Sequence, residues 1–284
     1  MKFKQRGVLK KFFVTGIGYT SRNIGKMIDA HCHLTAPEFD NDREAVIQAA
    51  KMAGVESIVV VSQFASDFAQ VMALKESYPD FIHPCLGLHP IQNENKCVSL
   101  SDFDDCKNTI TEYKDVLAGI GEIGLDFTPH YIKSPEDKEI QRNVFRKQIA
   151  LAREFDLAVN VHSRSAGRPV VDILIKEGAT KVLLHAFDGN PKVARRGVEA
   201  GFYFSVPPSV IRSEQTQKFV SKIPLSNLLL ETDSPALGPE KQVRNVPSNL
   251  IISCNEVARI KGISSDIVKE ETTRNCLKLF GSIK

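Results

Sequence analysis

From residue 27 onward, short apolar runs alternate along the chain with stretches in which apolar and polar residues follow a helical period. Several of the short runs are almost continuously apolar, for example Ile58-Val59-Val60-Val61 and Leu228-Leu229-Leu230. Such runs are typical of strands that are covered on both faces. Eight strands are predicted in this way: Met27–His33, Ser57–Ser62, Phe81–Gly87, Val116–Ile123, Leu157–His162, Lys181–Phe187, Gly201–Val206 and Leu228–Asp233.

The segments between these strands are amphipathic. Within residues 137–156, Phe145, Ile149 and Ala152 fall on one helical face and charged residues occupy the opposite side. Strands that alternate with helices predict a parallel sheet, and eight repeats favour a closed barrel over an open sheet. No low-complexity linker interrupts the pattern. We therefore expect an α/β fold, a single TIM-type (β/α)₈ barrel over residues 27–284.

The composition agrees with this expectation without adding to it. A chain of 284 residues with 42% hydrophobic and 25% charged residues is typical of a soluble globular protein. No apolar run approaches the ~20 residues that a membrane-spanning helix needs. The first apolar stretch, residues 12–17, is too short for a secretory signal. We expect a protein that does not cross a membrane.

The cysteines point to a reducing compartment. None of the six forms a CxxC pair: Cys32, Cys85, Cys97, Cys106, Cys254 and Cys276. In a long chain without a secretory signal, free thiols in a cytosol-like compartment are the better interpretation. The expected localisation is intracellular, cytoplasmic or nuclear, and a zinc ribbon built on cysteines is excluded.

Positive charge is concentrated at the N-terminus. Residues 1–27 hold seven of the 37 basic residues and no acidic one, so the other 30 basic residues face all 34 acidic ones, a net charge of −4. Two interpretations of residues 1–26 stay open: a mitochondrial transit segment, or a disordered extension before the strand at Met27. Because the rest of the chain is mildly acidic, any binding of nucleic acid depends on local cations and bound metal. The candidate cations are Arg164, Arg168, Lys192, Arg195, Arg196 and Arg212.

Histidines gather at the predicted strand ends. His31 and His33 stand two residues apart at the end of the first strand, so both point to one face, while Cys32 points to the other. An isolated HxH pair is more often structural than metal-binding. Four of the seven histidines, however, lie at such ends, since His162 closes the fifth strand and His185 lies at the end of the sixth. His83 and His130 lack this placement.

Two carboxylates share the same position. Glu122 closes the fourth strand within an apolar, glycine-rich run, and Asp233 closes the eighth. A buried carboxylate needs a cationic partner, and barrel enzymes place their active sites at this face. We therefore expect a metal site. Imidazole and carboxylate ligands suit Zn²⁺, Mn²⁺ or Fe, whereas Mg²⁺ normally takes oxygen ligands.

Six ligands are too many for one tetrahedral zinc but suit two ions with a bridging carboxylate, ~3.5–4 Å apart. We expect two divalent metal ions, with Zn, Mn and Mg as the candidates. Such a pair hydrolyses phosphoesters, amides and lactones alike, so the ligands alone indicate the reaction type and not the substrate.

Several strings of the chain occur together in one known family. They run in order as DAHCHL at 29–34, GLHP at 87–90, GEIGLD at 121–126, VHSRSA at 161–166, LHAFDG at 184–189 and ETDSP at 231–235. Over residues 27–280 the chain resembles the TatD family of metal-dependent deoxyribonucleases, which belongs to the amidohydrolase-like barrels. Within that family it is most similar to the third vertebrate TatD-domain type.

The resemblance implies a role for each residue. It implies that His31 and His33 bind the first ion, that Glu122 bridges, and that His162 and His185 bind the second ion. Asp233 is implied both as a ligand and as the catalytic base.

His89 and Arg164 match positions suited to binding the substrate phosphate. Two structural alternatives stay open: His89 braces the loop before Pro90, or Arg164 pairs with a carboxylate such as Asp172. The chain also departs from the family at Phe127, where a tyrosine is usual, and this removes a possible hydrogen bond to substrate or water.

The leading hypothesis for function is hydrolysis of DNA phosphodiesters, with DNA as the substrate and no obligate protein partner. A small-molecule amidohydrolase or phosphoesterase on the same barrel is the alternative, because function resides in the loops and not in the fold. A non-catalytic scaffold with a relic site is the third, disfavoured by the presence of all six metal-type residues.

Overall fold

A computed structural model describes residues 26–92 and 95–283 of the protein, so both interpretations of the N-terminal extension fall, apart from Lys26, outside the described residues. Eight strands form one parallel sheet in the order β1-β2-β3-β6-β7-β8-β9-β10. Their bounds are β1 Met27–Cys32, β2 Val55–Val61, β3 Ile82–Leu86, β6 Gly119–Gly124, β7 Ala158–His162, β8 Val182–Leu184, β9 Tyr203–Val206 and β10 Leu228–Leu230.

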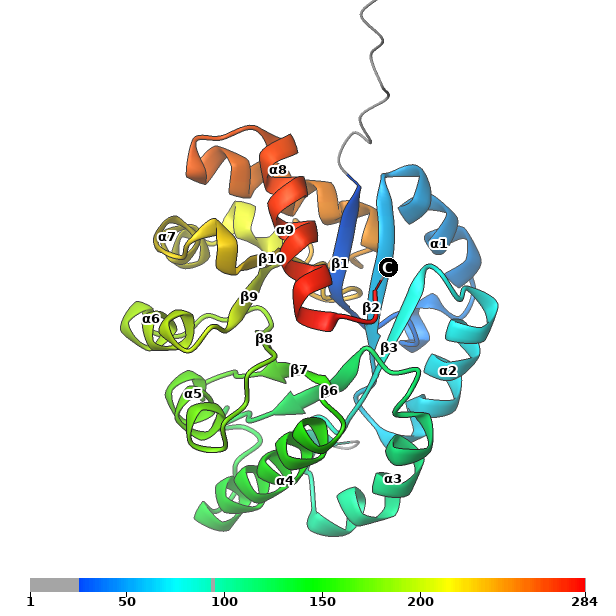
Figure 1. Ribbon diagram of the computed structural model, residues 1–284, viewed down its shortest axis with the longest axis vertical. Helices are drawn as coiled ribbons and strands as arrows, with labels where there is room; N and C mark the ends of the chain where they lie inside the picture. Colours follow the sequence, from blue (N-terminus) through cyan, green and yellow to red (C-terminus); the bar gives the residue numbers. More distant parts are fainter. Residues whose placement is uncertain (1–25, 93–94, 284) are drawn as a thin grey trace, which may run out of the picture.

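The sheet curls so that its two edge strands meet (Figure 1). Past the end of β10, the amide of Asp233 donates to the carbonyl of His31 at 2.9 Å, and the amide of His33 donates to the carbonyl of Ser234 at 2.9 Å. The predicted α/β barrel is therefore confirmed, and each predicted strand overlaps an observed one.

Helices cover the outside of the barrel (Figure 1). They are α1 Arg43–Met52, α2 Phe68–Ser77, α3 Leu100–Tyr113, α4 Pro135–Glu154, α5 Gly167–Lys176, α6 Pro191–Glu199, α7 Glu214–Lys222, α8 Leu250–Lys261 and α9 Ser265–Phe280. A short hairpin, β4 (Ile91–Gln92) and β5 (Lys96–Cys97), follows β3. No helix in the described ranges has the length and apolar character that crossing a membrane requires.

The helix expected within 137–156 begins earlier than its apolar pattern. Ser134 caps α4, since its Oγ accepts from the amide of Asp137 at 3.3 Å and the Asp137 carboxylate accepts from the amide of Ser134 at 2.9 Å. This reciprocal capping satisfies amides that the helix itself leaves free, and Pro135 at the first helical position adds to it. These capping residues make α4 begin at Pro135, two residues before the expected range.

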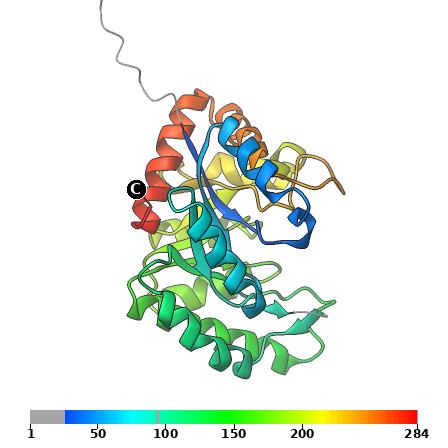
Figure 2. The same ribbon diagram turned by 90° about the vertical axis from the view of Figure 1, so that its right-hand side faces the viewer.

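The strands divide the core into two layers. Ile58 and Val60 of β2 pack outward against the helices, whereas Val59 and Val61 pack into the barrel interior. Leu279 and Phe280 of α9 join the interior layer. In the side view, α9 lies against one end of the barrel and β1 runs away from it towards the loops (Figure 2). The opposite end of the barrel carries the polar cluster described next.

Two glycines of β6 allow this strand to lie unusually close to β7. A Cβ atom at Gly121 would come within 2.6 Å of the Cβ of Asn160. Gly124 has φ +144°, and a Cβ there would come within 2.1 Å of the carbonyl oxygen of His162. The close approach brings Glu122, which stands between these glycines, beside the end of β7.

Candidate metal centre

Six polar side chains converge at the carboxyl ends of five strands. All are buried, with at most 8% of the surface of any of them exposed. They are the six residues singled out above: His31 and His33 at the end of β1, Glu122 in β6, His162 at the end of β7, His185 directly after β8 and Asp233 three residues after β10.

One half of the cluster consists of His31, His33 and Asp233. The Nε2 atoms of the two imidazoles are 3.2 Å apart. The Oδ1 atom of Asp233 lies 3.4 Å from each of them. These three side chains therefore present three electronegative atoms to one small volume.

Glu122 joins this half to the other. Its Oε1 atom lies 2.9 Å from Nδ1 of His162 and 2.8 Å from Nε2 of His185. Its Oε2 atom lies 3.3 Å from Nε2 of His33. Each carboxylate oxygen of Glu122 therefore faces a different half of the cluster, which is the arrangement that a bridging carboxylate requires.

The hydrogen bonds of Asn160 determine which ring nitrogen of His31 faces the cluster. Asn160 donates from Nδ2 to the carbonyl of Ala30 at 2.9 Å, so its Oδ1 is the atom that faces Nδ1 of His31 at 2.8 Å. The ring proton therefore sits on Nδ1, and Nε2 directs a lone pair at His33 and Asp233. Within the described residues, Oε2 of Glu122 also accepts no hydrogen bond. Electronegative atoms that converge in a buried cluster need protons or a metal cation between them, and the donor set fits Zn²⁺ or Mn²⁺.

The electrostatics of the cluster support this interpretation. Burial raises the pKa of the Glu122 carboxyl, but His89, His185 and His162 outweigh burial and hold that pKa well below its usual range. Burial lowers the pKa of His33, but contacts with Asp233 and Glu122 outweigh it and raise the pKa of His33 to about 10. The ionised carboxylates thus hold protons on imidazoles, at positions where a divalent ion supplies the same positive charge.

His89 borders the cluster from the loop after β3. Its Nε2 atom lies 3.8 Å from Oε1 of Glu122, and its ring stands edge-on to that of His162 at 4.5 Å between centroids. Its Nδ1 atom contacts the backbone of Ile91 within 3.0 Å. Burial chiefly, together with nearby His162, lowers the pKa of His89 to about 4 although Glu122 opposes this. A neutral imidazole therefore braces the loop and faces the cluster at the same time.

Arg164 stands at the mouth of the cluster, where its side chain is exposed. The alternative in which it pairs with Asp172 is wrong, because Asp172 contacts Arg196 at 2.5 Å. Among the described residues no carboxylate pairs with the Arg164 guanidinium, which leaves it available to an anion.

A known protein family covers most of this chain. The family described as "TatD related DNase" matches residues 28–281 of the chain. The chain belongs to this family. The matched region contains the whole barrel apart from the first residue of β1, and the TatD resemblance inferred from the sequence strings is confirmed.

Individual TatD relatives support the assignment. A human protein named deoxyribonuclease TATDN3 is 52% identical over 262 residues, covering 91% of this chain and 96% of its own length. A Bacillus subtilis protein named as an uncharacterized metal-dependent hydrolase, YabD, is 36% identical and covers 89% of this chain and 98% of its own. The crystal structure of the Escherichia coli TatD homologue YjjV superposes with a TM-score of 0.82 at 29% identity, covering 91% of this chain and 99% of its own.

Three polar residues that lie beside the imidazoles of this TatD site were missed by the sequence analysis. Asp126 lies 3.0 Å from Nε2 of His162, Asn160 contacts His31 as described, and Oε2 of Glu231 lies 3.7 Å from Nδ1 of His185. Their spacing was a usable signal. Asp126 is four residues after Glu122, Asn160 stands two residues before His162 on the same face of β7, and Glu231 stands two residues before Asp233.

The pKa of Asp126 shows how charge is balanced beside His162. Burial raises the pKa of its carboxyl, but His162 outweighs burial, and with Thr128 it lowers the pKa of Asp126 to about 2. An ionised Asp126 keeps a proton on Nε2 of His162 and so directs the other ring nitrogen, Nδ1, at Glu122.

The departure at Phe127 does not reach the TatD site. Its ring packs beneath Lys138 and Arg142 of α4, at 5.2 and 5.1 Å from the cationic groups. It does not line either cavity next to the cluster. The expectation that this residue withholds a hydrogen bond from the substrate is therefore not supported by the structure.

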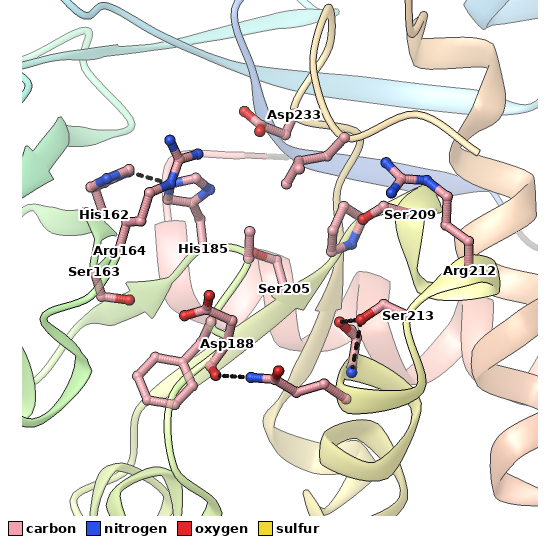
Figure 3. Close-up of a pocket in the computed structure, with 16 residues that line it drawn as sticks. His162, Ser163, Arg164, His185, Asp188, Ser205, Ser209, Arg212, Ser213 and Asp233 are labelled. Atoms are coloured by element: carbon pink, nitrogen blue, oxygen red, sulfur yellow. Dashed lines mark hydrogen bonds between the residues drawn. The ribbon is translucent and has the colours of Figure 1, made fainter. Parts of the chain in front are cut away.

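Two cavities meet at the cluster. The larger, about 470 Å³, opens towards the loops after β1 and β3 and includes His33, His89 and Tyr131. The smaller, about 280 Å³, extends towards Arg212 and is drawn in Figure 3. Four residues line both cavities: His162, Arg164, His185 and Asp233. The TatD cluster therefore lies between two cavities, with room for substrate on both sides.

Proposed function

We propose that the protein is a divalent-metal-dependent deoxyribonuclease that hydrolyses DNA phosphodiester bonds at a dinuclear site. The observation that carries the proposal is the buried cluster of four imidazoles and two carboxylates between two open cavities, with the unpaired Arg164 at its mouth. The deoxyribonuclease name of the human relative supports DNA as the substrate.

The residues divide into two ligand sets. His31, His33 and Asp233 would hold one ion, His162 and His185 would hold the other, and Glu122 would contact both. Because nitrogen donors predominate, Zn²⁺ or Mn²⁺ suits the set better than Mg²⁺. Two such ions, when bound, acidify a water molecule and neutralise charge on the phosphoryl oxygens.

The protein side chains then move one proton. Asp233 takes it from the attacking water as the new phosphorus–oxygen bond forms. The ester bond to the leaving oxygen breaks, and Asp233 returns the proton to that oxygen. General acid–base catalysis of this kind contributes roughly 10²–10⁴-fold to the rate.

His89 and Arg164 bind the non-bridging oxygens of the phosphate in this proposal. His89 is buried, neutral and fixed by its contact with Ile91. Arg164 is exposed and carries a full positive charge at the mouth. The pair therefore offers one donor inside the cavity and one cation at its opening, which suits a phosphodiester better than a neutral amide.

The test is a panel of end-labelled single-stranded DNA, double-stranded DNA and RNA, together with small esters, each assayed with Mg²⁺, Mn²⁺ and Zn²⁺. The proposal predicts metal-dependent cleavage of DNA that is abolished by EDTA and strongly reduced in Glu122→Gln prepared in parallel. Cleavage of small esters alone, with intact DNA under every condition, would instead establish the small-molecule alternative.

A further inference from the structure

The smaller cavity has features that metal binding does not explain. It is bordered by the segments that follow β7, β8, β9 and β10, and it runs from the cluster to Arg212 and the start of α7 (Figure 3). We call it the side pocket. Its volume of about 280 Å³ is just below the ~300–1,000 Å³ of pockets that hold small ligands. It therefore has room for about one nucleotide unit beside the cluster.

Arg212 gives the far wall of the side pocket a positive charge. Its Nε atom donates to the carbonyl of Gly238 at 3.1 Å, which anchors the guanidinium, and no described residue accepts a hydrogen bond from its two NH₂ groups. No carboxylate in the described ranges pairs with it. Figure 3 shows Arg164 and Arg212 on opposite sides of the pocket. An anchored guanidinium without a carboxylate partner is suited to bidentate recognition of a phosphate.

Ser209 supplies an independent sign of a ligand. The residue is 8% exposed, lines the side pocket and stands beside Arg212 in Figure 3. Its hydroxyl makes no hydrogen bond with any residue that the structure describes. Because this hydroxyl opens on the pocket, a ligand there can accept its proton in place of water.

The start of helix α7 adds backbone donors to the same wall. Ser213 caps the helix by accepting from the amide of Thr216 at 3.2 Å. The amides of Glu214 and Gln215, in the first turn, precede the first intrahelical hydrogen bond. Free amides at a helix N-terminus attract phosphate groups. The side chain of Gln215 fixes this turn by donating to the carbonyl of Asp188 at 2.5 Å.

Asp188 sets the opposite polarity in the pocket. Its exposed carboxylate lines the side pocket on the β8 side, away from Arg212 in Figure 3. A carboxylate repels phosphate but accepts hydrogen bonds from hydroxyl and amino groups. The pocket thus offers cations to a phosphate at Arg212 and an acceptor to a sugar or base at Asp188.

We propose that the side pocket binds the phosphate next along the strand from the scissile one, held by Arg212, the Ser209 hydroxyl and the first amides of α7. This inference rests on the proposed function and adds to it a requirement for the substrate. A phosphodiester that is flanked by a second phosphate is then a better substrate than an isolated one. Arg212 and Ser209 are specificity-determining residues.

Binding tests the proposal without cleavage. Thymidine 3′,5′-bisphosphate and the two thymidine monophosphates are titrated calorimetrically into the full-length protein with Mn²⁺. We expect the bisphosphate to bind at least ~10-fold more tightly than either monophosphate, the size of effect of a charged bidentate contact. Arg212→Gln should remove most of this difference, and Ser209→Ala should reduce it. Arg274→Gln, which removes the same charge from α9, should keep it.

Kinetics separate this proposal from the function on which it rests. The measured quantity is the ratio of kcat/KM for a thymidine trinucleotide to that for bis(p-nitrophenyl) phosphate. Arg212→Gln should lower this ratio by ~10–100-fold. A ratio equal to that of the wild type, or no preference of the wild type for the bisphosphate, would overturn the side-pocket proposal while DNA cleavage stands. An Arg212-dependent preference for the bisphosphate in a protein that cleaves no DNA would support the pocket and overturn the nuclease.

Discussion

At the residue scale, three imidazoles of the cluster have their other ring nitrogen near an oxygen. His31 contacts Asn160 at 2.8 Å, His162 contacts Asp126 at 3.0 Å, and His185 lies 3.7 Å from Glu231. Such partners fix the tautomer and the orientation of a ligating imidazole. The ring nitrogens that face Glu122 and Asp233 are therefore positioned by contacts within the protein.

Asp233 and His33 should differ in what excess metal can restore. Asp233→Asn keeps the size of the side chain and one ligating oxygen but cannot accept the proton of the attacking water. His33→Ala removes a ligand and leaves proton transfer intact. In single-turnover cleavage across a Mn²⁺ titration, we expect His33→Ala to recover partly, and Asp233→Asn to stay roughly 10²–10⁴-fold slow at full metal content. Recovery of the wild-type rate by Asp233→Asn would reduce this residue to a ligand.

The sequence predicted which residues meet at the cluster but not how their ring nitrogens are used. Strand alternation was enough to place His31 and His33 on one face. Spacing could have marked Asp126 and Asn160 as candidates, but which imidazole each of them contacts depends on how β1, β6 and β7 are placed around the barrel, which no local pattern encodes. The same limit applies to Arg164, whose suggested partner Asp172 is held by Arg196.

At the element scale, the close contact between β6 and β7 brings Glu122 to His162, and Gly124 makes that contact possible. Gly124→Ala places a Cβ 2.1 Å from the His162 carbonyl at φ +144°. Because both strain and overlap result, we expect a loss of at least ~2–4 kcal/mol in the free energy of unfolding. Gly201→Ala is the matched control, since φ is +84° but no atom lies within 4 Å. It should cost about 1 kcal/mol. Equal losses in urea unfolding would contradict this account of β6.

His83 of β3 should make stability depend on pH. Burial chiefly, with help from Lys75, lowers the pKa of His83 to about 4, and its Nε2 has no hydrogen-bond partner in the described structure. The unfolded chain therefore binds this proton more readily than the folded one, and stability falls as pH drops from about 6.5 towards 4. The free energy of unfolding, measured in urea at pH 5 and at pH 7.5, should differ less between the two pH values in His83→Leu than in the wild type. The control is His130→Gln, at an exposed histidine, which should leave the difference between the two free energies as in the wild type. An unaltered difference in His83→Leu would contradict the low pKa.

Apolar runs located the strands better than they located the strand ends. The sixth strand was predicted as Lys181–Phe187, but β8 pairs only over Val182–Leu184. His185 follows the strand directly, and Ala186 turns the chain with φ +41°. Where a strand stops depends on hydrogen bonds to its neighbours, and an apolar run continues through buried turns as readily as through paired residues.

At the scale of the whole molecule, the barrel separates stability from chemistry. Helix α9 packs against the interior layer near one end, and the polar cluster lies at the carboxyl ends of the strands. This division is general for (β/α)₈ barrels, which is why eight alternating repeats predicted both the fold and the location of the site. The side pocket was not predictable, because it depends on how the segments after β7, β8, β9 and β10 come together.

The barrel should not need the basic segment before Met27. Met27 is buried in the core, and its amide donates to the carbonyl of Gly54 at 3.0 Å. Lys26 adds an exposed pair with Glu56, of the kind worth at most about 1 kcal/mol. A chain that begins at Met27 should therefore keep its thermal midpoint within a few degrees and its kcat/KM on DNA. A large fall in either quantity would assign the first 26 residues a part in folding or catalysis.

The most direct test of the whole account is the number of metal ions bound per chain, measured by inductively coupled plasma mass spectrometry after gel filtration. Glu122 is the residue that contacts both halves of the cluster, and Glu122→Gln keeps its shape but leaves only one good ligand oxygen. The account predicts two ions of Zn²⁺ or Mn²⁺ in the wild type and at most one in Glu122→Gln, with loss of DNA cleavage. Two ions in both proteins, or none in an active wild type, would contradict a dinuclear site bridged by Glu122.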